Sequence, residues 1–360
     1  MSRLHNFSAG PAVLPEPVVR RTQEALWELN GSGLGLCECS HRSALFDGVL
    51  ASAKTRLRAL LQLSDDQEVL FLPGGAQTQF YQVPMNLLGG GRASYLDTGV
   101  WSAGAMREAK PFGTVDVAYS SGPLHSHVPQ ASDLGGTPEG TKFLHYTSNN
   151  TVAGTQFHYV PDVQEGVWRI CDVSSDIVSQ PIQGSEFDLL YAGAQKNLGP
   201  SGLALVVIRK ALLDHCDEQI PTMLRYGVQV AKNSMFNTPN TFAIYVIDQV
   251  CQWIEEQGGL EAVGARNRAQ AGRIYGVIDG SDFWTGKARL DSRSLMNLTF
   301  TTGDADRDTR FHLLAAEQGM AGLKGHRIVG GLRASIYNAQ TDAAVDALVE
   351  FMREFERTNG

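Results

Sequence analysis

Residues 191–202 read Tyr-Ala-Gly-Ala-Gln-Lys-Asn-Leu-Gly-Pro-Ser-Gly and place one lysine, Lys196, between an apolar run and a Gly/Pro turn. Small neighbours allow a planar ring to approach the backbone, and partial desolvation favours the neutral amine, the form that attacks an aldehyde. An ordinary loop lysine that faces solvent is also compatible with this window, because a short motif is only a hypothesis. What surrounds Lys196 in the folded chain separates the two interpretations.

The sequence on either side of Lys196 alternates between short apolar runs and helical patterns. Gly, Ser or Asn follows most of the runs, which span residues 69–72, 93–96, 142–146, 167–171 and 189–192. This rhythm predicts an α/β fold built on a mostly parallel sheet. Near the amino terminus, a helix that stops at Asn30-Gly31 is predicted from the spacing of Val19, Thr22, Leu26 and Leu29.

The last third of the chain has a different pattern. Apolar residues at helical spacing over 243–254 end at Gly258-Gly259, where we place a domain boundary. Apolar and polar residues then alternate over 296–301 and 332–337, as in strands with one buried face, and a final helical pattern spans 345–355. The predicted domains are a large one of residues 16–258 and a small α+β one of residues 1–15 and 259–360.

Composition limits the class of partner. The formal net charge of −8 and the sequence pI near 5.6 provide no basic field that would attract nucleic acid or an anionic membrane, so a small molecule is the expected partner. No apolar run approaches the roughly 20 residues that cross a bilayer. The amino terminus lacks the apolar segment of a secretory signal, and five irregularly spaced cysteines form no disulfide framework. We therefore expect a soluble cytoplasmic protein.

Three further positions suggest a ligand site. Asp172 directly follows the run 167–171, at the edge where open α/β sheets bind ligands. It can hold a protonated ring nitrogen, with a Coulomb energy of about 4 kcal/mol at ~4 Å, or it can merely cap a turn. Residues 73–78 (Pro-Gly-Gly-Ala-Gln-Thr) join a strand to a helix, an arrangement whose amides bind phosphate, although a bare Gly-Gly turn is weak evidence. Trp101 can stack on a ring or belong to the core.

Cations gather in two glycine-bearing segments, residues 40–42 (Ser-His-Arg) and 324–333 (Lys-Gly-His-Arg-Ile-Val-Gly-Gly-Leu-Arg). Arginine forks match carboxylate and phosphate oxygens, which makes these segments candidate anion receptors. Solvated surface charge is the alternative. A metal site at Cys37, Cys39 and His41 is not expected, because the Cys-x-Cys spacing has no second pair to complete a tetrahedron.

Taken together, these windows resemble the phosphoserine aminotransferases, a family of enzymes that use pyridoxal 5'-phosphate (PLP). The matching segments, in family order from end to end, are residues 6–15, 40–42, 191–200, 234–239 and 324–338. The resemblance implies the aspartate-aminotransferase fold, fold type I, with a large domain on a mostly parallel seven-stranded sheet and a smaller α+β domain.

The resemblance also implies roles for individual residues. Lys196 is expected to form the Schiff base, Asp172 to contact the ring nitrogen and Trp101 to stack on the ring. The remaining cofactor contacts are expected from Gln195 and Thr151 and from the backbone amides of Ala76 and Gln77. Some relatives carry arginine at the position of Gln77, so here the phosphate would depend on backbone amides and the helix end.

The resemblance further implies a homodimer in which Asn237 and Thr238 reach the phosphate bound in the partner subunit. Arg42 and Arg333 are expected to hold substrate carboxylates. The phosphate or distal carboxylate is expected to contact His41, His326 and Arg327.

The implied reaction is reversible transamination between L-glutamate and 3-phosphohydroxypyruvate, which gives O-phospho-L-serine and 2-oxoglutarate in serine biosynthesis. The resemblance extends it to 3-hydroxy-2-oxo-4-phosphobutanoate, which gives 4-phosphohydroxy-L-threonine for pyridoxine biosynthesis. Another class-V PLP enzyme, such as an alanine- or serine-glyoxylate aminotransferase or a cysteine desulfurase, is one alternative. A cofactor-free phosphate-binding protein is the alternative from a different class.

Overall fold

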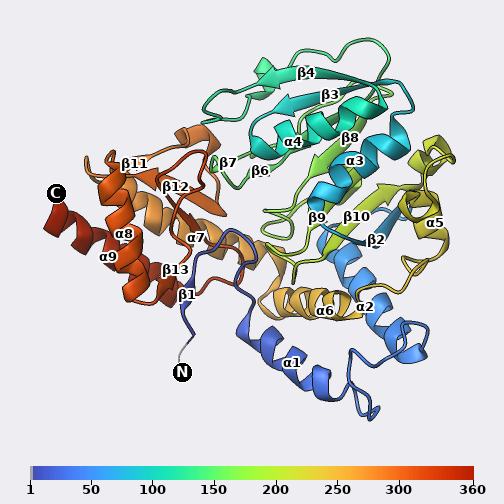
Figure 1. Ribbon diagram of the computed structural model, residues 1–360, viewed down its shortest axis with the longest axis horizontal. Helices are drawn as coiled ribbons and strands as arrows, with labels where there is room; N and C mark the ends of the chain where they lie inside the picture. The colour runs from blue at the N-terminus through green and yellow to red at the C-terminus, as the bar shows by residue number, and fades with distance from the viewer. Residues whose placement is uncertain (1–2) are drawn as a thin grey trace.

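A seven-stranded sheet occupies the middle of the chain in the computed structural model, which describes residues 3–360 (Figure 1). The strand order is β2-β10-β9-β8-β5-β3-β4, and β10 alone runs antiparallel to its neighbours. The strands are β2 (Gln67–Pro73), β3 (Arg92–Asp97), β4 (Thr114–Ser120), β5 (Thr141–Thr147), β8 (Trp168–Asp172), β9 (Leu189–Gly193) and β10 (Leu203–Arg209). The predicted mostly parallel sheet is confirmed, and the five predicted runs form β2, β3, β5, β8 and β9.

Both faces of this sheet are buried, which explains why its strands read as continuous apolar runs. In β2, Val69 and Phe71 pack in one hydrophobic cluster with α2 and α6, whereas Leu70 and Leu72 pack in another with α3 and α4. The edge strand β4 has no fully buried residue and mixes polar with apolar residues, so it gave no apolar run to predict. The helices of this part are α1 (Glu16–Trp27), α2 (Ala44–Leu60), α3 (Ala76–Leu87), α4 (Val100–Ala109), α5 (Tyr226–Ala231) and α6 (Thr241–Glu256).

The predicted helix near the amino terminus is present as α1, but its apolar face was assigned wrongly. Val18, Thr22 and Ala25 are buried, whereas Val19 is 37% exposed and Leu26 is 45% exposed. The helix begins at Glu16. The face that packs on α6 carries Val18 and Ala25, each one residue before the apolar residue used for the prediction. Spacing alone cannot choose between two adjacent apolar stripes.

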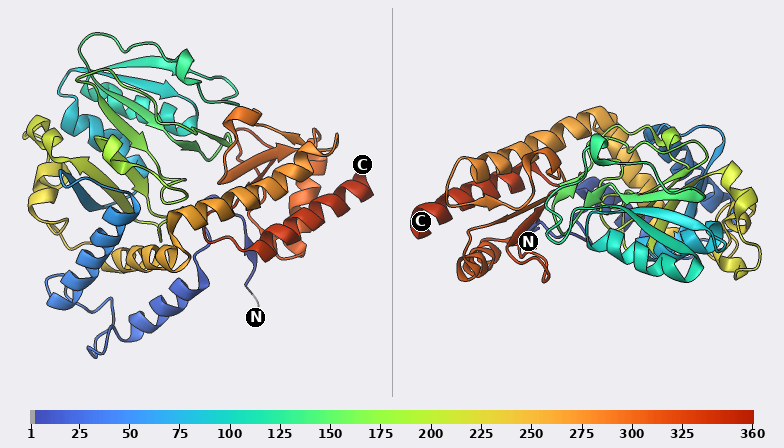
Figure 2. Two further views of the ribbon diagram at one scale, coloured as in Figure 1. Left: turned by 180° about the vertical axis from the view of Figure 1, so that it is seen from behind. Right: turned by 90° about the horizontal axis from the view of Figure 1, so that it is seen from above.

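The carboxy-terminal part packs helices on a three-stranded sheet of order β11-β12-β14. Its elements are α7 (Gly259–Asp279), β11 (Thr285–Gly286), β12 (Asn297–Thr301), α8 (Ala305–Glu317), β13 (Met320–Ala321), β14 (Leu332–Ser335) and α9 (Asp342–Asn359). Figure 2 shows from behind that α7 leads out of the larger part and lies beside α9. The short strand β1 (His5–Asn6) pairs with β13, which brings the start of the chain to this part.

The prediction of one buried face on the strands of this smaller sheet is wrong. Asn297 and Thr299 are as buried as Leu298, with exposed fractions of 0% and 3%. Their face packs against the hairpin formed by β6 (Asn149–Asn150) and β7 (Thr155–Gln156), where the Thr299 hydroxyl donates to the Ala153 carbonyl at 2.9 Å. The alternation is therefore one of apolar and hydrogen-bonded polar residues, both buried.

A separate hydrophobic cluster fills the smaller part, with contributions from Phe7, α7, α8 and α9. The chain turns sharply between α6 and α7, where Gly258 adopts the left-handed conformation at φ 93°. These features support the proposed division at residues 258 and 259, which stays a prediction. Within residues 3–360, no helix is both long enough and apolar enough to cross a membrane.

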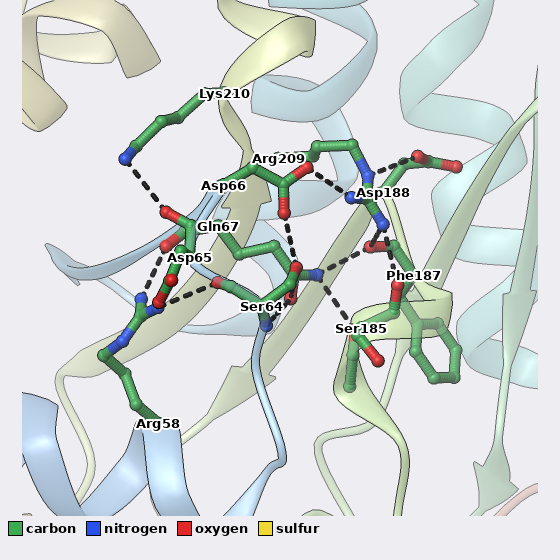
Figure 3. A network of polar contacts seen from close by, with 11 residues as sticks. Arg58, Ser64, Asp65, Asp66, Gln67, Ser185, Phe187, Asp188, Arg209 and Lys210 are labelled. Carbon is green, nitrogen blue, oxygen red and sulfur yellow. Dashed lines mark hydrogen bonds and ion pairs between the residues drawn. The ribbon is translucent and has the colours of Figure 1, made fainter.

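A polar network ties the sheet together at the amino ends of its parallel strands (Figure 3). Arg209, at the end of β10, pairs with Asp66 at 2.5 Å and with Asp188 at 3.0 Å. The Gln67 side chain donates to the carbonyls of Gly184 and Phe187 at 2.9 and 2.8 Å. The loops at this end are thus held by ion pairs and hydrogen bonds in which the donors and acceptors are paired with one another.

Candidate active site

A cavity of about 230 Å³ lies at the carboxyl ends of β2, β8 and β9. Its lining joins the predicted lysine loop, the aspartate that ends β8, the turn before α3 and the aromatic residue of α4. The lining residues are Gly75, Ala76, Gln77, Thr78, Phe80, Trp101, Asp172, Ser174, Gln195 and Lys196. Segments that are far apart in the sequence thus meet in one place, as the strand-end position of Asp172 predicted.

Lys196 points into this cavity rather than into solvent. Its Nζ donates a hydrogen bond to Thr151 Oγ1 at 2.8 Å and lies 5.5 Å from the centre of the Trp101 ring. Burial lowers the pKa of Lys196 to about 8, although the carboxylates of Asp172 and Asp176 oppose that shift. The interpretation as a solvent-facing loop lysine is therefore wrong, and the side chain is available as a neutral amine near physiological pH.

Asp172 is the last residue of β8 and is 4% exposed. Its Oδ1 accepts hydrogen bonds from the backbone N–H of Ser174 at 2.9 Å and from the Ser174 hydroxyl at 2.5 Å. Burial raises the pKa of Asp172, while Lys196 and Ser174 lower it. Asp172 therefore caps its turn and also lines the cavity, so both interpretations from the sequence apply.

No cation among residues 3–360 lies within 4 Å of the Asp172 carboxylate, and its Oδ2 accepts no hydrogen bond from them. A buried carboxylate without a cation is costly unless a ligand supplies one. The Trp101 indole Nε1 is likewise buried without a partner in the described part of the chain. Both groups fit a bound molecule that carries a cationic ring nitrogen and polar substituents.

The turn before α3 provides the anion-binding part of the cavity. Gly74 has φ 103°, which lets the chain reverse after β2, and α3 begins at Ala76 with Gly75 as its N-cap. The first N–H groups of a helix, here at Ala76 and Gln77, have no acceptor inside that helix and carry its positive dipole end. The Gln77 side chain itself is exposed. These residues fit the terminal phosphate of a cofactor through backbone amides.

A cluster of cations lies on the other side of Thr151. Arg333, on β14, donates from Nη1 to the Thr151 carbonyl at 3.2 Å, and its buried Nε has no partner in the described chain. Burial lowers the pKa of His326, and the charges of Arg333 and Arg327 lower it further. None of the three forms an ion pair within residues 3–360, so an anion can bind them.

Eight of the predicted site residues are absent from the lining of this cavity: Thr151, His326, Arg327 and Arg333, described above, and four that lie elsewhere in the chain. His41 and Arg42 belong to the connection between α1 and α2, at the lower edge of Figure 1, and Arg42 is exposed. Asn237 and Thr238 precede α6; Thr238 is exposed, and the Asn237 side chain donates to the Thr238 carbonyl at 3.1 Å. A single chain therefore does not assemble every residue that the sequence resemblance assigned to the site.

The structure also adds residues that the sequence did not single out. Ser174 anchors Asp172 and accepts a hydrogen bond from the Gly193 N–H at 3.0 Å, which ties the ends of β8 and β9 together. Phe80 and Thr78 line the cavity from α3. The Asp172-x-Ser174 spacing, which is typical of a side-chain-capped turn, was the one available signal for Ser174.

The fold and this lysine cavity define an aminotransferase of class V, and the family model described as aminotransferase class-V matches residues 4–348. A phosphoserine aminotransferase of Desulfatibacillum aliphaticivorans is 48% identical over 363 residues, covering 100% of this chain and 99% of that protein. A solved phosphoserine aminotransferase of Bacillus circulans subsp. alkalophilus has 44% identity and a TM-score of 0.97, with 99% of both chains covered. The PLP-bound phosphoserine aminotransferase of Trichomonas vaginalis has 37% identity and a TM-score of 0.92, with 98% of this chain and 100% of that chain covered. The chain belongs to the phosphoserine aminotransferase family, which confirms the resemblance read from its sequence.

Proposed function

We propose that the chain catalyses the reversible transfer of an amino group from L-glutamate to 3-phosphohydroxypyruvate, giving 2-oxoglutarate and O-phospho-L-serine for serine biosynthesis. One observation carries this proposal: Lys196 Nζ and Arg333 Nη1 are both hydrogen-bonded to Thr151, at its hydroxyl and its carbonyl. The Lys196 amine, which can react with a carbonyl compound, and the Arg333 guanidinium, which can hold a carboxylate, are therefore both positioned by Thr151. Membership of the family supports the same reaction.

PLP is the cofactor whose features the cavity residues fit. Lys196 would hold it covalently, Asp172 would pair with the ring nitrogen, Trp101 would stack on the ring, and Ala76 and Gln77 would bind the phosphate through their amides. Gln195 and Thr151 would complete the hydrogen bonds. Bound in this way, PLP supplies an electron sink that stabilises negative charge at the substrate α-carbon.

The chain's own residues then perform the proton transfer and the binding. Nζ of Lys196 would take the proton from the α-carbon of glutamate and, in the second half of the reaction, give a proton to the α-carbon of the acceptor, a task suited to an amine whose pKa of about 8 lies near physiological pH. Thr151 Oγ1 fixes the direction of that amine. Asp172, kept ionised by a cation on the ring, holds the ring nitrogen in its protonated form.

Arg333 would bind the α-carboxylate of either substrate, because its guanidinium carries free donors at the edge of the site. Arg42 would also hold a substrate carboxylate, and His41, His326 and Arg327 would bind the phosphate or the distal carboxylate. A site built for a carboxylate and a phosphate has little means to refuse one added hydroxymethylene group, so 3-hydroxy-2-oxo-4-phosphobutanoate is expected as a second acceptor, for pyridoxine biosynthesis.

A homodimer accounts for the residues that a single chain leaves outside the cavity. Asn237 and Thr238 would reach the phosphate bound in the partner subunit; Asn237 is partly exposed and Thr238 is exposed, which is compatible with such a contact. We also propose a cytoplasmic location, which the five free cysteines support because a reducing compartment keeps thiols unpaired.

A glyoxylate-type aminotransferase of the same class is the nearest alternative. Its acceptor carries no phosphate, so the cluster of His326, Arg327 and Arg333 would have only one small carboxylate to bind. A cofactor-free phosphate-binding protein would not require an amine in the cavity. The position of Lys196 disfavours the second alternative, and the cation cluster disfavours the first.

The proposal is tested by the absorbance of the purified PLP-bound protein. L-Glutamate should convert the visible band of the lysine Schiff base to the shorter-wavelength band of the aminated cofactor. Addition of 3-phosphohydroxypyruvate should restore the first band at least about a hundredfold faster than glyoxylate does, a difference that unpaired site cations impose on an acceptor lacking phosphate. Equal rates with the two acceptors would favour the glyoxylate-type alternative.

A further inference from the structure

The hairpin of β6 and β7 carries Thr151, the residue to which both Lys196 and Arg333 donate hydrogen bonds. Its two strands pair Asn149 with Gln156 and Asn150 with Thr155, and Thr151 is the first residue of the connecting turn. The position of Thr151 Oγ1, and with it the direction of the Lys196 amine, depends on how this short hairpin is held. Two residue pairs are too few to stabilise a hairpin alone, so side chains outside it must do so.

Asp176 binds the base of that hairpin from both sides. Its Oδ1 accepts a hydrogen bond from the Ser148 hydroxyl at 2.5 Å, and its Oδ2 accepts one from the Gln156 amide at 3.2 Å. Ser148 directly precedes β6, and Gln156 ends β7. One carboxylate therefore connects the entry and the exit of the hairpin.

The geometry of Gln156 requires an acceptor at residue 176. The Gln156 Oε1 accepts a hydrogen bond from the Leu295 N–H at 2.9 Å, which fixes the amide so that its NH₂ group points to Asp176. The start of the hairpin is also joined to β8, the strand that ends at Asp172, because the Ser148 N–H donates to the Asp172 carbonyl at 3.0 Å. Asp176 thus completes a connection from β8 through the hairpin to the smaller part of the chain.

The charge on Asp176 has no direct counterion. No ion pair within 4 Å joins it to a cation in the described part of the chain, and the charged groups that act on it are Asp172 and Lys196. The neighbouring titratable groups are Tyr146 and Cys171, both buried with pKa values raised by burial. On its other side Asp176 borders a second cavity of about 190 Å³, which Tyr146, Ser148 and Gln180 also line.

We propose that Asp176 is a positioning residue that holds the β6–β7 hairpin by its base, so that Thr151 directs the Lys196 amine and supports Arg333. Asp176 is not among the residues that line the lysine cavity and forms no hydrogen bond with Lys196; its carboxylate is bonded to Ser148 and Gln156. The inference rests on the proposed function, because it takes Lys196 as the reacting amine. Burial raises the pKa of Asp176 to about 7, which agrees with a carboxyl group placed for hydrogen bonding rather than for pairing with a cation.

The test uses the PLP-bound protein with Asp176→Asn and with the double variant Asp176→Asn/Gln156→Glu. In the single variant an NH₂ group replaces one of the two accepting oxygens, so at most one of the hydrogen bonds from Ser148 and Gln156 keeps its acceptor. The double variant restores a donor and an acceptor in exchanged positions, while the carboxylate introduced at position 156 can still accept from the Leu295 N–H. Asp116→Asn, which removes the partner of Arg92 on the edge strand β4, is the matched control for loss of one carboxylate.

Two measurements are made on each variant: amide hydrogen exchange of residues 148–157 and the transamination rate at saturating substrate. Asp176→Asn should speed hairpin exchange and lower kcat by about tenfold to a hundredfold, the loss expected from one hydrogen bond to a charged group, while KM for glutamate changes little. The double variant should regain most of the slow hairpin exchange and most of kcat, and the control should change neither quantity. Ser148→Ala, which keeps Asp176, should give the same changes to a smaller extent if Asp176→Asn does not fold.

Unchanged hairpin exchange in Asp176→Asn, or no recovery in the double variant, would overturn the assignment. Hydrogen exchange does not depend on which reaction is catalysed, so the positioning effect can hold even where the proposed substrates are wrong. Failure of the proposed function would instead appear in the glutamate and acceptor experiment on the unaltered protein.

Discussion

The two ends of the central sheet treat charge in opposite ways. At the amino ends of the parallel strands, Arg209 pairs directly with Asp66 and Asp188, and its neighbours satisfy the surrounding carbonyls (Figure 3). At the carboxyl ends, Lys196 and Asp172 face one cavity, and neither has an oppositely charged partner within 4 Å among residues 3–360. The same sheet thus has paired charges at the amino ends of its parallel strands and unpaired buried charges at their carboxyl ends.

The difference indicates which edge is built for stability and which for binding. A paired network at a partly exposed edge holds loops in place at little cost. Buried charges without partners lower stability, and they persist where a ligand completes them. The pKa values agree, because the pKa of Lys196 is lowered by burial whereas that of Asp66 is lowered by its hydrogen bonds to Ser64 and Arg209.

Substitution of Lys196 by Ala should have the largest effect and should fall on activity alone. We expect transamination to drop by about a thousandfold or more, because both the covalent anchor and the proton carrier are removed. The visible Schiff-base absorbance and borohydride trapping should disappear. The free energy of unfolding of the cofactor-free protein should stay within about 1 kcal/mol, since a lysine penalised by burial contributes little to stability. Retained absorbance at visible wavelengths would show that another amine holds the cofactor.

Substitution of Arg209 by Met should have the opposite profile. Loss of its contacts with Asp66 and Asp188 should lower the free energy of unfolding by about 1–2 kcal/mol, because the pair is only partly buried, as urea unfolding can measure. The kcat should remain within about twofold of the unaltered protein, because the network lies at the far edge of the sheet. A tenfold loss of kcat in a folded variant would contradict the separation of the two edges.

The smallest effect concerns the pH dependence of stability. The folded-state pKa of Asp176 is about 7, above its usual value of 3.8, so the folded chain keeps a proton there that the unfolded chain loses. Its contribution is fully present below about pH 4 and is lost as the pH rises through 7. Asp66 behaves oppositely, because its lowered pKa gives a contribution that is lost as the pH falls.

Unfolding at pH 5 and pH 8 separates these two carboxyl groups. Asp176→Asn should reduce the loss of stability between the two pH values by about 1–2 kcal/mol, a figure discounted for its partial exposure. Asp66→Asn should leave that difference unchanged, since Asp66 is ionised in both states at both pH values. Equal changes in the two variants would contradict the assigned direction for Asp176.

Features encoded in consecutive residues could be predicted from the sequence. Lys196, Asp172 and the turn before α3 each stand at or shortly after the end of an apolar strand, and the carboxyl ends of parallel strands meet on one side of the sheet. Ser148 and Gln156 lie 28 and 20 residues before Asp176, and no pattern along the chain indicated that they contact it. The polar face of β12 was misjudged for the same reason, because its partner, the hairpin, lies more than 140 residues away.

The reversed direction of β10 has a consequence for the lysine loop. Antiparallel neighbours can be joined by a short link, whereas parallel ones need a crossover of a dozen or more residues. Residues 194–202 therefore link β9 directly to β10, and Lys196 lies in a turn in which the Leu198 and Gly199 N–H groups donate to the Ala194 carbonyl at 3.1 and 2.8 Å. An added or deleted residue would break the hydrogen bonds of this turn and move the Lys196 amine, so variation in length among related chains should accumulate in other loops and spare this one.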